Sequence, residues 1–418
     1  MAQLSDDCFA FGGRLMRVDR ALADLDSRLA PVTEAEVVPL ALAAGRYLAD
    51  HVVSDRAVPP HDNSAVDGYA VFFDDLAPEG PTTLPVTGRV AAGHPLGRAA
   101  RRGEALRVFT GAQLPDGPDA VLMQEDCRRD GDSVVIPPGI KRGANFRSAG
   151  EDVAVGATIL SAGRRLHPRD IGLAASIGRD RLPVFRRLRA ALFSTGDEVR
   201  EPGDAAPAGC IYDANRHALA AQLSQLGCTV SDLGILPDSA AALGSALAEA
   251  AAAHDLIVGS GGMSTGEEDH VKAAVETAGG RLHAWRLAIK PGRPVALGQV
   301  GSVPFIGLPG NPVAVLVTFL RIARPVILRL AGAADVTPRL FPVRAAFAYR
   351  KKPDRREYVR VMLSDGDDGT PLARKFPRDG AGILSSMVAA DGLVELAEDI
   401  TRLESGTIVP FLPFSEVE

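Results

Sequence analysis

Between residues 188 and 330, short apolar segments alternate with segments of helical periodicity, and this alternation constrains the fold more than any other feature. The predicted strands cover residues 188–193, 229–235, 256–258 and 303–306, and the predicted helices cover residues 213–226, 238–253, 269–277 and 313–330. In the first of these helices, Leu219, Leu223 and Leu226 share one face, and Gly227 follows its end. Because parallel strands need a long crossover connection, usually a helix, the pattern predicts a doubly wound parallel sheet.

The segments before and after this region differ from it in composition and in the spacing of apolar residues. Residues 14–29 carry apolar side chains at alternating steps of three and four, which predicts an amphipathic helix packed on the core. Residues 71–150 are rich in glycine and proline with short apolar runs, which is typical of a small β domain with many turns. From Asp335 onward apolar residues alternate along the chain and predict further strands. We therefore expect an α/β part with β-rich parts on both sides.

Composition and charge argue against several classes of protein. The 418 residues include 46 Lys and Arg and 52 Asp and Glu, a net charge of −6, so no overall basic surface is available for nucleic acid. The four cysteines have no paired spacing, which argues against a disulfide framework or a zinc knuckle. The apolar stretch 313–330 contains Arg321, Arg324 and Pro325, so we expect a core helix rather than a membrane span. No apolar leader is recognisable, and the expected location is the cytoplasm.

Two polar loops follow predicted strands of the sheet, at the edge where ligands bind in folds of this class. One is Thr195-Gly196-Asp197-Glu198, and the other runs from Gly259 to Asp269. Glycine leaves backbone N–H groups free to hold a phosphate, and acids beside a phosphate are tolerated when a divalent cation lies between them. Each loop alone is equally well explained as a turn with helix-capping acids, and neither matches a dinucleotide fingerprint or a P-loop. In combination they predict a phosphate site with a divalent ion.

Two stiff turns in the same region carry further groups that fit a binding site. Lys290-Pro291-Gly292-Arg293-Pro294 presents two cations on a backbone restricted by proline, which fits an anion site but also a solvated basic turn. The segment 307–312, Gly-Leu-Pro-Gly-Asn-Pro, ends a strand and starts a helix. A helix cap needs only Asn311 and Pro312, so the additional Pro309 and Gly310 predict the wall of a pocket.

The densest polar cluster of the chain lies outside the α/β region. Asp62, Asn63, Ser64 and Asp67 are close together in the sequence, although Asx and Ser turns explain some of them without any function. The histidines are dispersed and no H-E-x-x-H motif is present, which argues against a zinc protease. We do not expect Ser-His-Asp catalysis.

Eight stretches of the chain, in this order and spacing, closely resemble the molybdopterin molybdenumtransferase (MoeA) family, whose relatives include the C-terminal domain of gephyrin. They are residues 62–70, 109–112, 147–152, 194–198, 211–216, 260–262, 290–294 and 307–312, so the resemblance covers essentially the whole chain. It implies an L-shaped homodimer whose α/β domain resembles MogA adenylyltransferases. The implied parts are an N-terminal helix (1–28) packed on the α/β domain, a linking domain (29–54 and 153–180), a β-rich domain (55–152), the molybdopterin-binding α/β domain (181–330) and a C-terminal β-barrel (335–418).

The resemblance also implies a reaction, in which molybdate is inserted into adenylylated molybdopterin and AMP is released. The implied catalytic residues are Asp67, Asp152, Glu198 and Asp269, of which Glu198 and Asp269 are expected to hold Mg²⁺ or another divalent cation. The implied substrate-binding residues are Thr110, Thr195, Gly196, Asp238, Ser260, Gly261, Gly262, Ser264, Lys290, Arg293, Pro309, Pro312, Arg355 and Ser386. The loop around Asp67 is expected to reach the α/β site of the partner subunit. A MogA-like adenylyltransferase and molybdoenzyme apoproteins are the expected partners, with no nucleic acid and no membrane.

The sequence departs from the family pattern in the glycine loop and beside it. Met263 and Thr265 are bulkier or more polar than the usual residues, His270 replaces a frequent aromatic, and Arg293 stands where many members have lysine. The identity of the divalent ion and the choice between molybdate and tungstate stay open. Two alternative functions also stay open: a molybdopterin adenylyltransferase, which needs only the α/β part, and a non-catalytic gephyrin-like scaffold, which has no use for acids beside a phosphate site.

Overall fold

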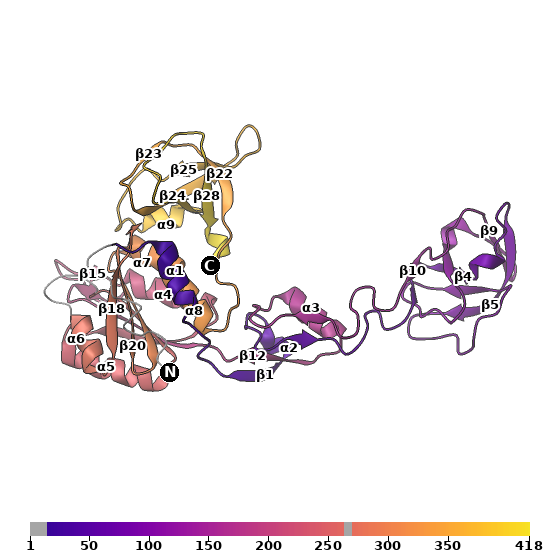
Figure 1. Ribbon diagram of the computed structural model, residues 1–418, viewed down its shortest axis with the longest axis horizontal. Coiled ribbons are helices and arrows are strands. Elements are labelled where there is room, and N and C mark those ends of the chain that lie inside the picture. The colour runs from indigo at the N-terminus through magenta and orange to yellow at the C-terminus, as the bar shows by residue number, and fades with distance from the viewer. Residues whose placement is uncertain (1–14, 263–269) are drawn as a thin grey trace.

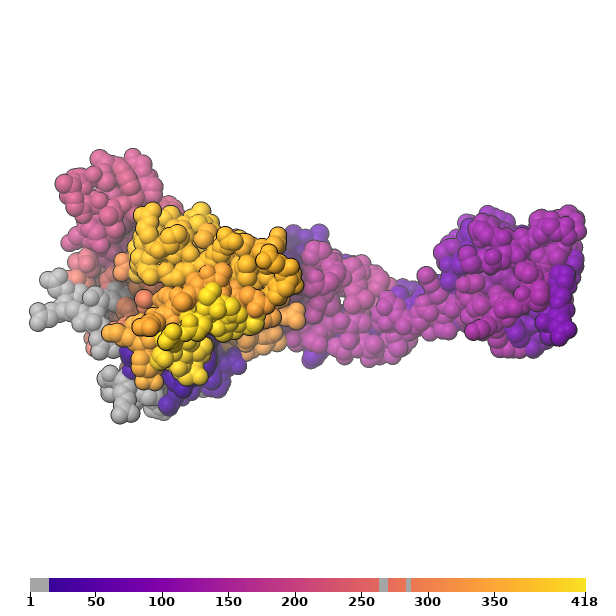
Figure 2. Space-filling view, turned by 90° about the horizontal axis from the view of Figure 1, so that it is seen from above, coloured from indigo at the N-terminus to yellow at the C-terminus, as the bar shows by residue number. Residues whose placement is uncertain are grey.

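The molecule is elongated, with an α/β domain and a barrel at one end and a β-rich domain at the other (Figure 1). The computed structural model describes residues 15–262 and 270–418, and only the backbone of residues 283–286. A small domain connects the two ends, and a second view shows that this connection is narrow (Figure 2). None of the helices in the described ranges has the length and apolar character needed to cross a membrane.

A six-stranded sheet in the order β16-β13-β17-β21-β20-β18 forms the centre of the α/β domain. Its strands are β13 (Arg189–Thr195), β16 (Thr229–Leu236), β17 (Leu256–Ser260), β18 (Arg281–Arg286), β20 (Pro294–Val300) and β21 (Val303–Leu308). The pairs β16–β13, β13–β17 and β17–β21 are parallel, as predicted. The pairs β21–β20 and β20–β18 are antiparallel instead. Only Gly301 and Ser302 join β20 to β21, and so short a connection cannot make the crossover that parallel pairing needs.

Helices cover both faces of this sheet. They are α1 (Val18–Asp26), α4 (Ala214–Gln225), α5 (Ala240–Ala253), α6 (His270–Thr277), α7 (Pro312–Thr318) and α8 (Arg324–Leu330). Buried residues of α1, α4, α7 and α8 share one hydrophobic core, and those of α5 and α6 form a second core on the other face. This arrangement confirms the doubly wound α/β class. The short pair β14 (Val199–Arg200) and β15 (Ile211–Tyr212) lies in the loop between β13 and α4.

The long apolar helix predicted for residues 313–330 is interrupted in the structure. A π-helical turn, η4 (Phe319–Ala323), separates α7 from α8. Pro325 is the second residue after this turn; it has no N–H group, and its ring would clash with the carbonyl four residues earlier in a regular helix. The wider turn before Pro325 therefore accommodates the proline while the segment stays buried.

Two smaller β structures precede the α/β domain in the chain. The connecting domain contains β1 (Ala35–Pro39), α2 (Leu40–Ala43), β2 (Val52–Val53), β11 (Thr158–Leu160), α3 (Pro168–Ser176) and β12 (Arg181–Phe185). The β-rich domain contains β3 (Asn63–Ser64), β4 (Gly68–Val71), η2 (Phe73–Asp75), β5 (Thr82–Val90), β6 (Ala105–Val108), β7 (Ala120–Met123), η3 (Gln124–Asp126), β8 (Arg128–Asp130), β9 (Ser133–Ile136) and β10 (Phe146–Arg147). Six of these strands form one sheet in the order β7-β4-β6-β5-β9-β8.

The C-terminal region forms the predicted barrel. Its elements are β22 (Phe341–Ala345), β23 (Tyr349–Arg350), β24 (Arg356–Ser364), β25 (Leu372–Lys375), α9 (Ser385–Ala389), β26 (Gly392–Leu396), β27 (Arg402–Leu403), β28 (Ile408–Pro413) and η5 (Phe414–Glu416). The order β24-β25-β22-β28-β26 closes because β26 pairs back to β24. One more strand, β19 (Ile289–Lys290), comes from the α/β domain and pairs with the start of β24. Backbone hydrogen bonds therefore join the barrel to the α/β domain.

Candidate active site

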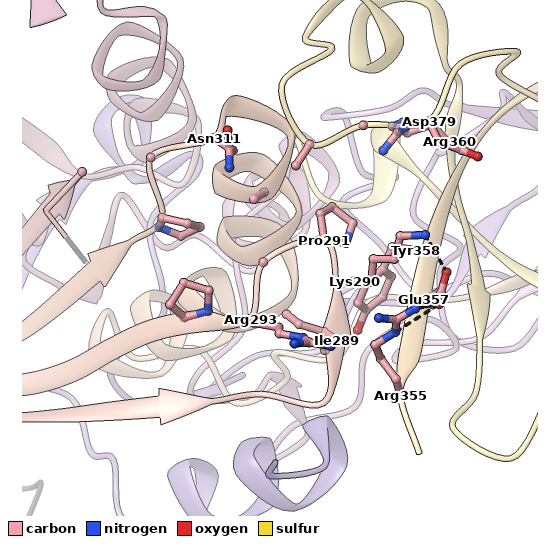
Figure 3. A pocket seen from close by; sticks show the side chains of 18 of the residues that line it. Ile289, Lys290, Pro291, Arg293, Asn311, Arg355, Glu357, Tyr358, Arg360 and Asp379 are labelled. Carbon is pink, nitrogen blue, oxygen red and sulfur yellow. Dashed lines mark hydrogen bonds and ion pairs between the residues drawn. The ribbon is translucent and has the colours of Figure 1, made fainter. Parts of the chain in front are cut away.

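A cavity of about 920 Å³ lies between the carboxyl ends of the α/β strands and the barrel (Figure 3). Its volume is typical of a site for a small organic ligand. Of the residues predicted from the sequence, it brings together Thr195, Gly196, Glu198, Asp238, Gly261, Gly262, Lys290, Arg293, Pro309 and Arg355. The barrel adds residues that the sequence did not single out, among them Tyr349, Glu357, Tyr358, Arg360, Lys375 and Asp379.

On the α/β side, two loops are packed so tightly, within one loop and between the two, that they require glycine. A Cβ atom at Gly196 would lie 2.7 Å from a carboxylate oxygen of Glu198, and one at Gly261 would overlap the carbonyl oxygen of Thr195. Both glycines also have positive φ angles, of 146° and 89°. The glycines therefore bring the Glu198 carboxylate and the second loop against the end of β13.

Two oxygen atoms in this wall are buried without a hydrogen-bond partner among the described residues. They are Oγ1 of Thr195, which ends β13, and Oδ1 of Asp238, which follows β16. Buried polar atoms are rarely left unpaired in folded proteins. Since both residues line the cavity, a bound ligand or ion is the natural partner for these oxygens.

The opposite wall carries the two cations of the proline-rich turn. Lys290 is half exposed, and its Nζ lies 3.4 Å from both the carboxylate of Glu357 and the hydroxyl of Tyr349. Arg293 is exposed at the cavity. Between them Gly292 packs on α7, where a Cβ atom would overlap Oγ1 of Thr318. The turn therefore packs closely on α7, and both of its cations line the cavity.

Arg360 is one of the cavity residues that sequence reasoning missed. Its side chain extends from β24 and is only 7% exposed, yet no described carboxylate forms an ion pair with it. Its Nη2 donates one long hydrogen bond, of 3.4 Å, to the carbonyl of Arg378, and its Nε has no partner among the described residues. Burial lowers the pKa of Arg360. A guanidinium in this state is suited to receive an anionic ligand. The available sequence signal was a charged residue within the apolar segment 358–363.

Three predicted residues lie at the other end of the molecule, in or next to the β-rich domain. Asp67 precedes β4, and its Oδ1 accepts hydrogen bonds of 2.8 Å from the backbone N–H and 2.9 Å from the hydroxyl of Thr110. These bonds lower the pKa of Asp67. Asp152 pairs through its backbone N–H with the carbonyl of Val58. Both views place this domain far from the cavity of the same chain (Figures 1 and 2).

The remaining predicted residues lie beside the cavity or outside the described ranges. Ser260 and Pro312 line a neighbouring cavity of about 100 Å³. Ser386 is fully buried in α9, where its hydroxyl donates to the carbonyl of Ile383 at 2.6 Å. Ser264 and Asp269 lie outside the described residues, as do Met263 and Thr265. Within the described ranges, no three His, Cys, Asp or Glu side chains gather as a metal site.

Comparison with known proteins gives the same family from end to end. Residues 16–178 match the model of the MoeA N-terminal region (domain I and II), residues 191–329 that of a probable molybdopterin binding domain, and residues 342–414 that of the MoeA C-terminal region (domain IV). The chain is 35% identical over 405 residues to a molybdopterin molybdenumtransferase of Haemophilus influenzae, covering 96% of this chain and 100% of that protein. It is 34% identical over 397 residues to molybdopterin molybdenumtransferase 2 of Mycobacterium tuberculosis, covering 93% and 96%.

A solved structure agrees with these sequence matches. The crystal structure of the molybdopterin biosynthesis moeA protein of Pyrococcus horikoshii superposes with a TM-score of 0.82 at 27% identity, covering 96% of this chain and 100% of that one. Sequence and fold therefore match along nearly the whole length of both chains. The chain belongs to the molybdopterin molybdenumtransferase (MoeA) family.

Proposed function

We propose that this chain inserts molybdate into adenylylated molybdopterin and releases AMP, and that it does so in the cytoplasm. The observation that supports this proposal best is that one cavity has two chemically different walls. One wall offers glycine loops and the unpaired oxygens of Thr195 and Asp238, and the other offers the cations Lys290, Arg293 and Arg360. A pterin nucleotide needs the first kind of wall and an oxyanion the second.

On the first wall, backbone N–H groups of the glycine loops would hold the phosphates of the nucleotide. Glu198 and the unpaired Asp238 offer the carboxylate oxygens that Mg²⁺ prefers, and Mg²⁺ usually takes one or two carboxylates plus substrate phosphates and water. These residues therefore fit a divalent ion, for which Asp269 stays a further predicted ligand. When bound, such an ion would offset the repulsion between the carboxylates and the phosphates.

On the second wall, Lys290, Arg293 and Arg360 would bind molybdate. Molybdate carries two negative charges, and transferring it from water into a cavity requires fixed positive charge. The guanidinium of Arg360 forms no ion pair among the described residues and is attracted only from a longer distance by Asp379, so it would gain a direct counter-ion when the oxyanion binds. The cations would place the oxyanion next to the pterin nucleotide, and this proximity is the main contribution that we assign to the chain.

We further infer that the working site is shared between the two subunits of a homodimer. Asp67 is held in one orientation by Thr110, although no described residue of the cavity lies near it in the same chain. A second copy would bring the β-rich domain, with Asp67 and Asp152, to the cavity of its partner. The substrate would come from a MogA-like adenylyltransferase, and the product would pass to molybdoenzyme apoproteins.

The two alternative functions are less well supported by the cavity. An adenylyltransferase needs only the α/β domain, whereas here the barrel supplies part of the wall, including Arg360. A scaffold gives no reason for a buried, unpaired arginine that faces a ligand-sized space.

The test is to incubate the purified protein with adenylylated molybdopterin, MgCl₂ and molybdate. We expect AMP release that depends on molybdate, measured by chromatography, and molybdenum bound to the pterin, measured by mass spectrometry. A parallel reaction with molybdopterin and ATP tests the adenylyltransferase alternative. No AMP and no molybdenum in the first reaction would refute the proposed function.

A further inference from the structure

Glu357 is a buried carboxylate in the wall that we assign to an oxyanion. Its side chain is 2% exposed, and it contacts cations from two different domains: Arg355 of the barrel and Lys290 of the α/β domain. Tyr349 adds a hydrogen bond of 2.8 Å from its hydroxyl. Burial alone would raise the pKa of Glu357, but the hydrogen bonds from Arg355 and Tyr349 lower it, so the carboxylate is ionised. A negative charge at this position weakens anion binding unless it serves another purpose.

The two cations are held in very different ways. Arg355 directs both Nε, at 3.1 Å, and Nη2 to the same oxygen of Glu357, and its side chain is only 14% exposed. Lys290 lies 3.4 Å from the other oxygen, and its side chain is 47% exposed. The ammonium group of Lys290 has three N–H donors and so retains free donors toward the cavity. Glu357 therefore accepts hydrogen bonds from two of the five N–H donors of Arg355 and makes one longer contact with Lys290 (Figure 3).

The backbone fixes the distance between Glu357 and Lys290. The two residues are directly opposite each other in the parallel pairing of β19 with β24. Next to this pair, the N–H of Arg356 donates to the carbonyl of Ala288 at 2.7 Å. The carboxylate is thus attached to the residue at which the proline-rich turn begins.

We propose that Glu357 is a positioning residue, which holds the Lys290 ammonium in place for the oxyanion. Arg355 supports Glu357 through two of its N–H donors. This inference rests on the proposed function. It also predicts an effect opposite in sign to that of simple charge. Removing a carboxylate beside an anion should tighten binding by charge alone, whereas loss of positioning weakens it.

The test is Glu357→Gln, which keeps the shape of the side chain and removes its charge. We expect the KM for molybdate to rise at least about tenfold, the effect of one charge-assisted hydrogen bond. The KM for the pterin nucleotide and the kcat at saturating molybdate should stay within about twofold of the wild-type values, because neither depends on the position of the Lys290 ammonium before molybdate binds. Titration calorimetry with molybdate alone should give the same weakening.

Two further variants keep the test decisive. Tyr349→Phe removes only the hydroxyl donor, and we expect a smaller rise of about two- to fivefold in the KM for molybdate. Glu395→Gln is the matched control, because Glu395 is another buried carboxylate of the barrel, paired at 3.0 Å with Arg321 away from the cavity. It should leave the KM for molybdate unchanged. If circular dichroism shows that Glu357→Gln does not fold, the Tyr349→Phe result decides.

Several outcomes would overturn the inference. An unchanged or lower KM for molybdate in Glu357→Gln would show that the carboxylate acts only through its charge or not at all. An equal rise in Glu395→Gln would show that only the docking of the barrel matters. If the wild-type protein releases no AMP, the proposed function fails, but calorimetry with molybdate still tests the positioning separately.

Discussion

Replacing Arg360 by methionine should make the unliganded protein more stable and the oxyanion site weaker. The guanidinium is 7% exposed, and a buried ion without a partner costs several kcal/mol in real proteins. The hydrogen bond that Arg360 donates to the carbonyl of Arg378 offsets part of this cost. Because methionine fills a similar length with no charge, we expect the free energy of unfolding to rise by about 1–2 kcal/mol.

The same substitution should remove a charge-assisted hydrogen bond to molybdate. Such a bond contributes about 1.5–3 kcal/mol, so the Kd for molybdate should rise about 10- to 150-fold. At a molybdate concentration of 100 times the wild-type Kd, the ligand stabilises the native protein by about 2.7 kcal/mol. In the Arg360→Met variant this gain should fall to about 1.4 kcal/mol or less.

Thermal unfolding with and without molybdate measures both effects in one experiment. The control is Arg321→Met, because Arg321 is a buried arginine that does have a carboxylate partner, Glu395. Its removal leaves Glu395 with only a longer contact of 4.0 Å to Arg356 and should destabilise the protein without changing the response to molybdate. If Arg360→Met instead destabilises the unliganded protein and keeps the full response, Arg360 is a structural residue and the reasoning is refuted.

Three further predictions concern other parts of the molecule. A homodimer of Asp67→Asn chains should be inactive. A heterodimer of one Asp67→Asn chain and one chain mutated in the cavity contains one intact shared site, so it should show about half the wild-type rate. No recovery of activity would exclude a shared site. Gly292→Ala, at φ 101°, places a Cβ atom on the hydroxyl of Thr318. We expect the free energy of unfolding, measured by chemical denaturation, to fall by about 1–3 kcal/mol and the KM for molybdate to rise. If neither quantity changes, the turn can shift to accept the methyl group. The hydrogen bond from Arg98 lowers the pKa of Glu104 from 4.5 to about 2. The ionised carboxylate therefore stabilises the folded protein fully above pH 4.5, and this stabilisation is lost as the pH falls toward 2. Glu104→Gln should make acid unfolding depend less on pH in this range, and an unchanged unfolding curve would contradict the prediction.

The alternation of strands and helices was sufficient to predict the α/β class, since each crossover helix leaves a periodic apolar face in the sequence. It did not predict that β18 and β20 run antiparallel, because strand direction depends on the connections and not on the apolar pattern of the strand itself. The break in the last helix was visible only as Pro325. A proline can end a helix, kink it or be absorbed by a wider turn, and the choice depends on the packing around it.

For the site, glycines were the most informative residues. A side chain at Gly261 would collide with the neighbouring loop, and one at Gly196 would collide with Glu198 of its own loop, so these glycines in the sequence already indicated two tight loops at one edge of the sheet. Arg360 and Glu357 gave no comparable signal. Both are charged residues in a strand, and their roles depend on which face of β24 meets the α/β domain.

The sequence by itself determined the family and predicted the order of the domains and the loops that we expect to carry the chemistry, because these depend on local patterns of apolar, glycine and proline residues. Only the tertiary structure decided which charges are paired. It places Lys290 opposite Glu357, pairs Arg355 with Glu357 and leaves Arg360 without an ion pair among the described residues. The physical reason is that the strength and availability of a charge depend on burial and on neighbours that are distant in the chain.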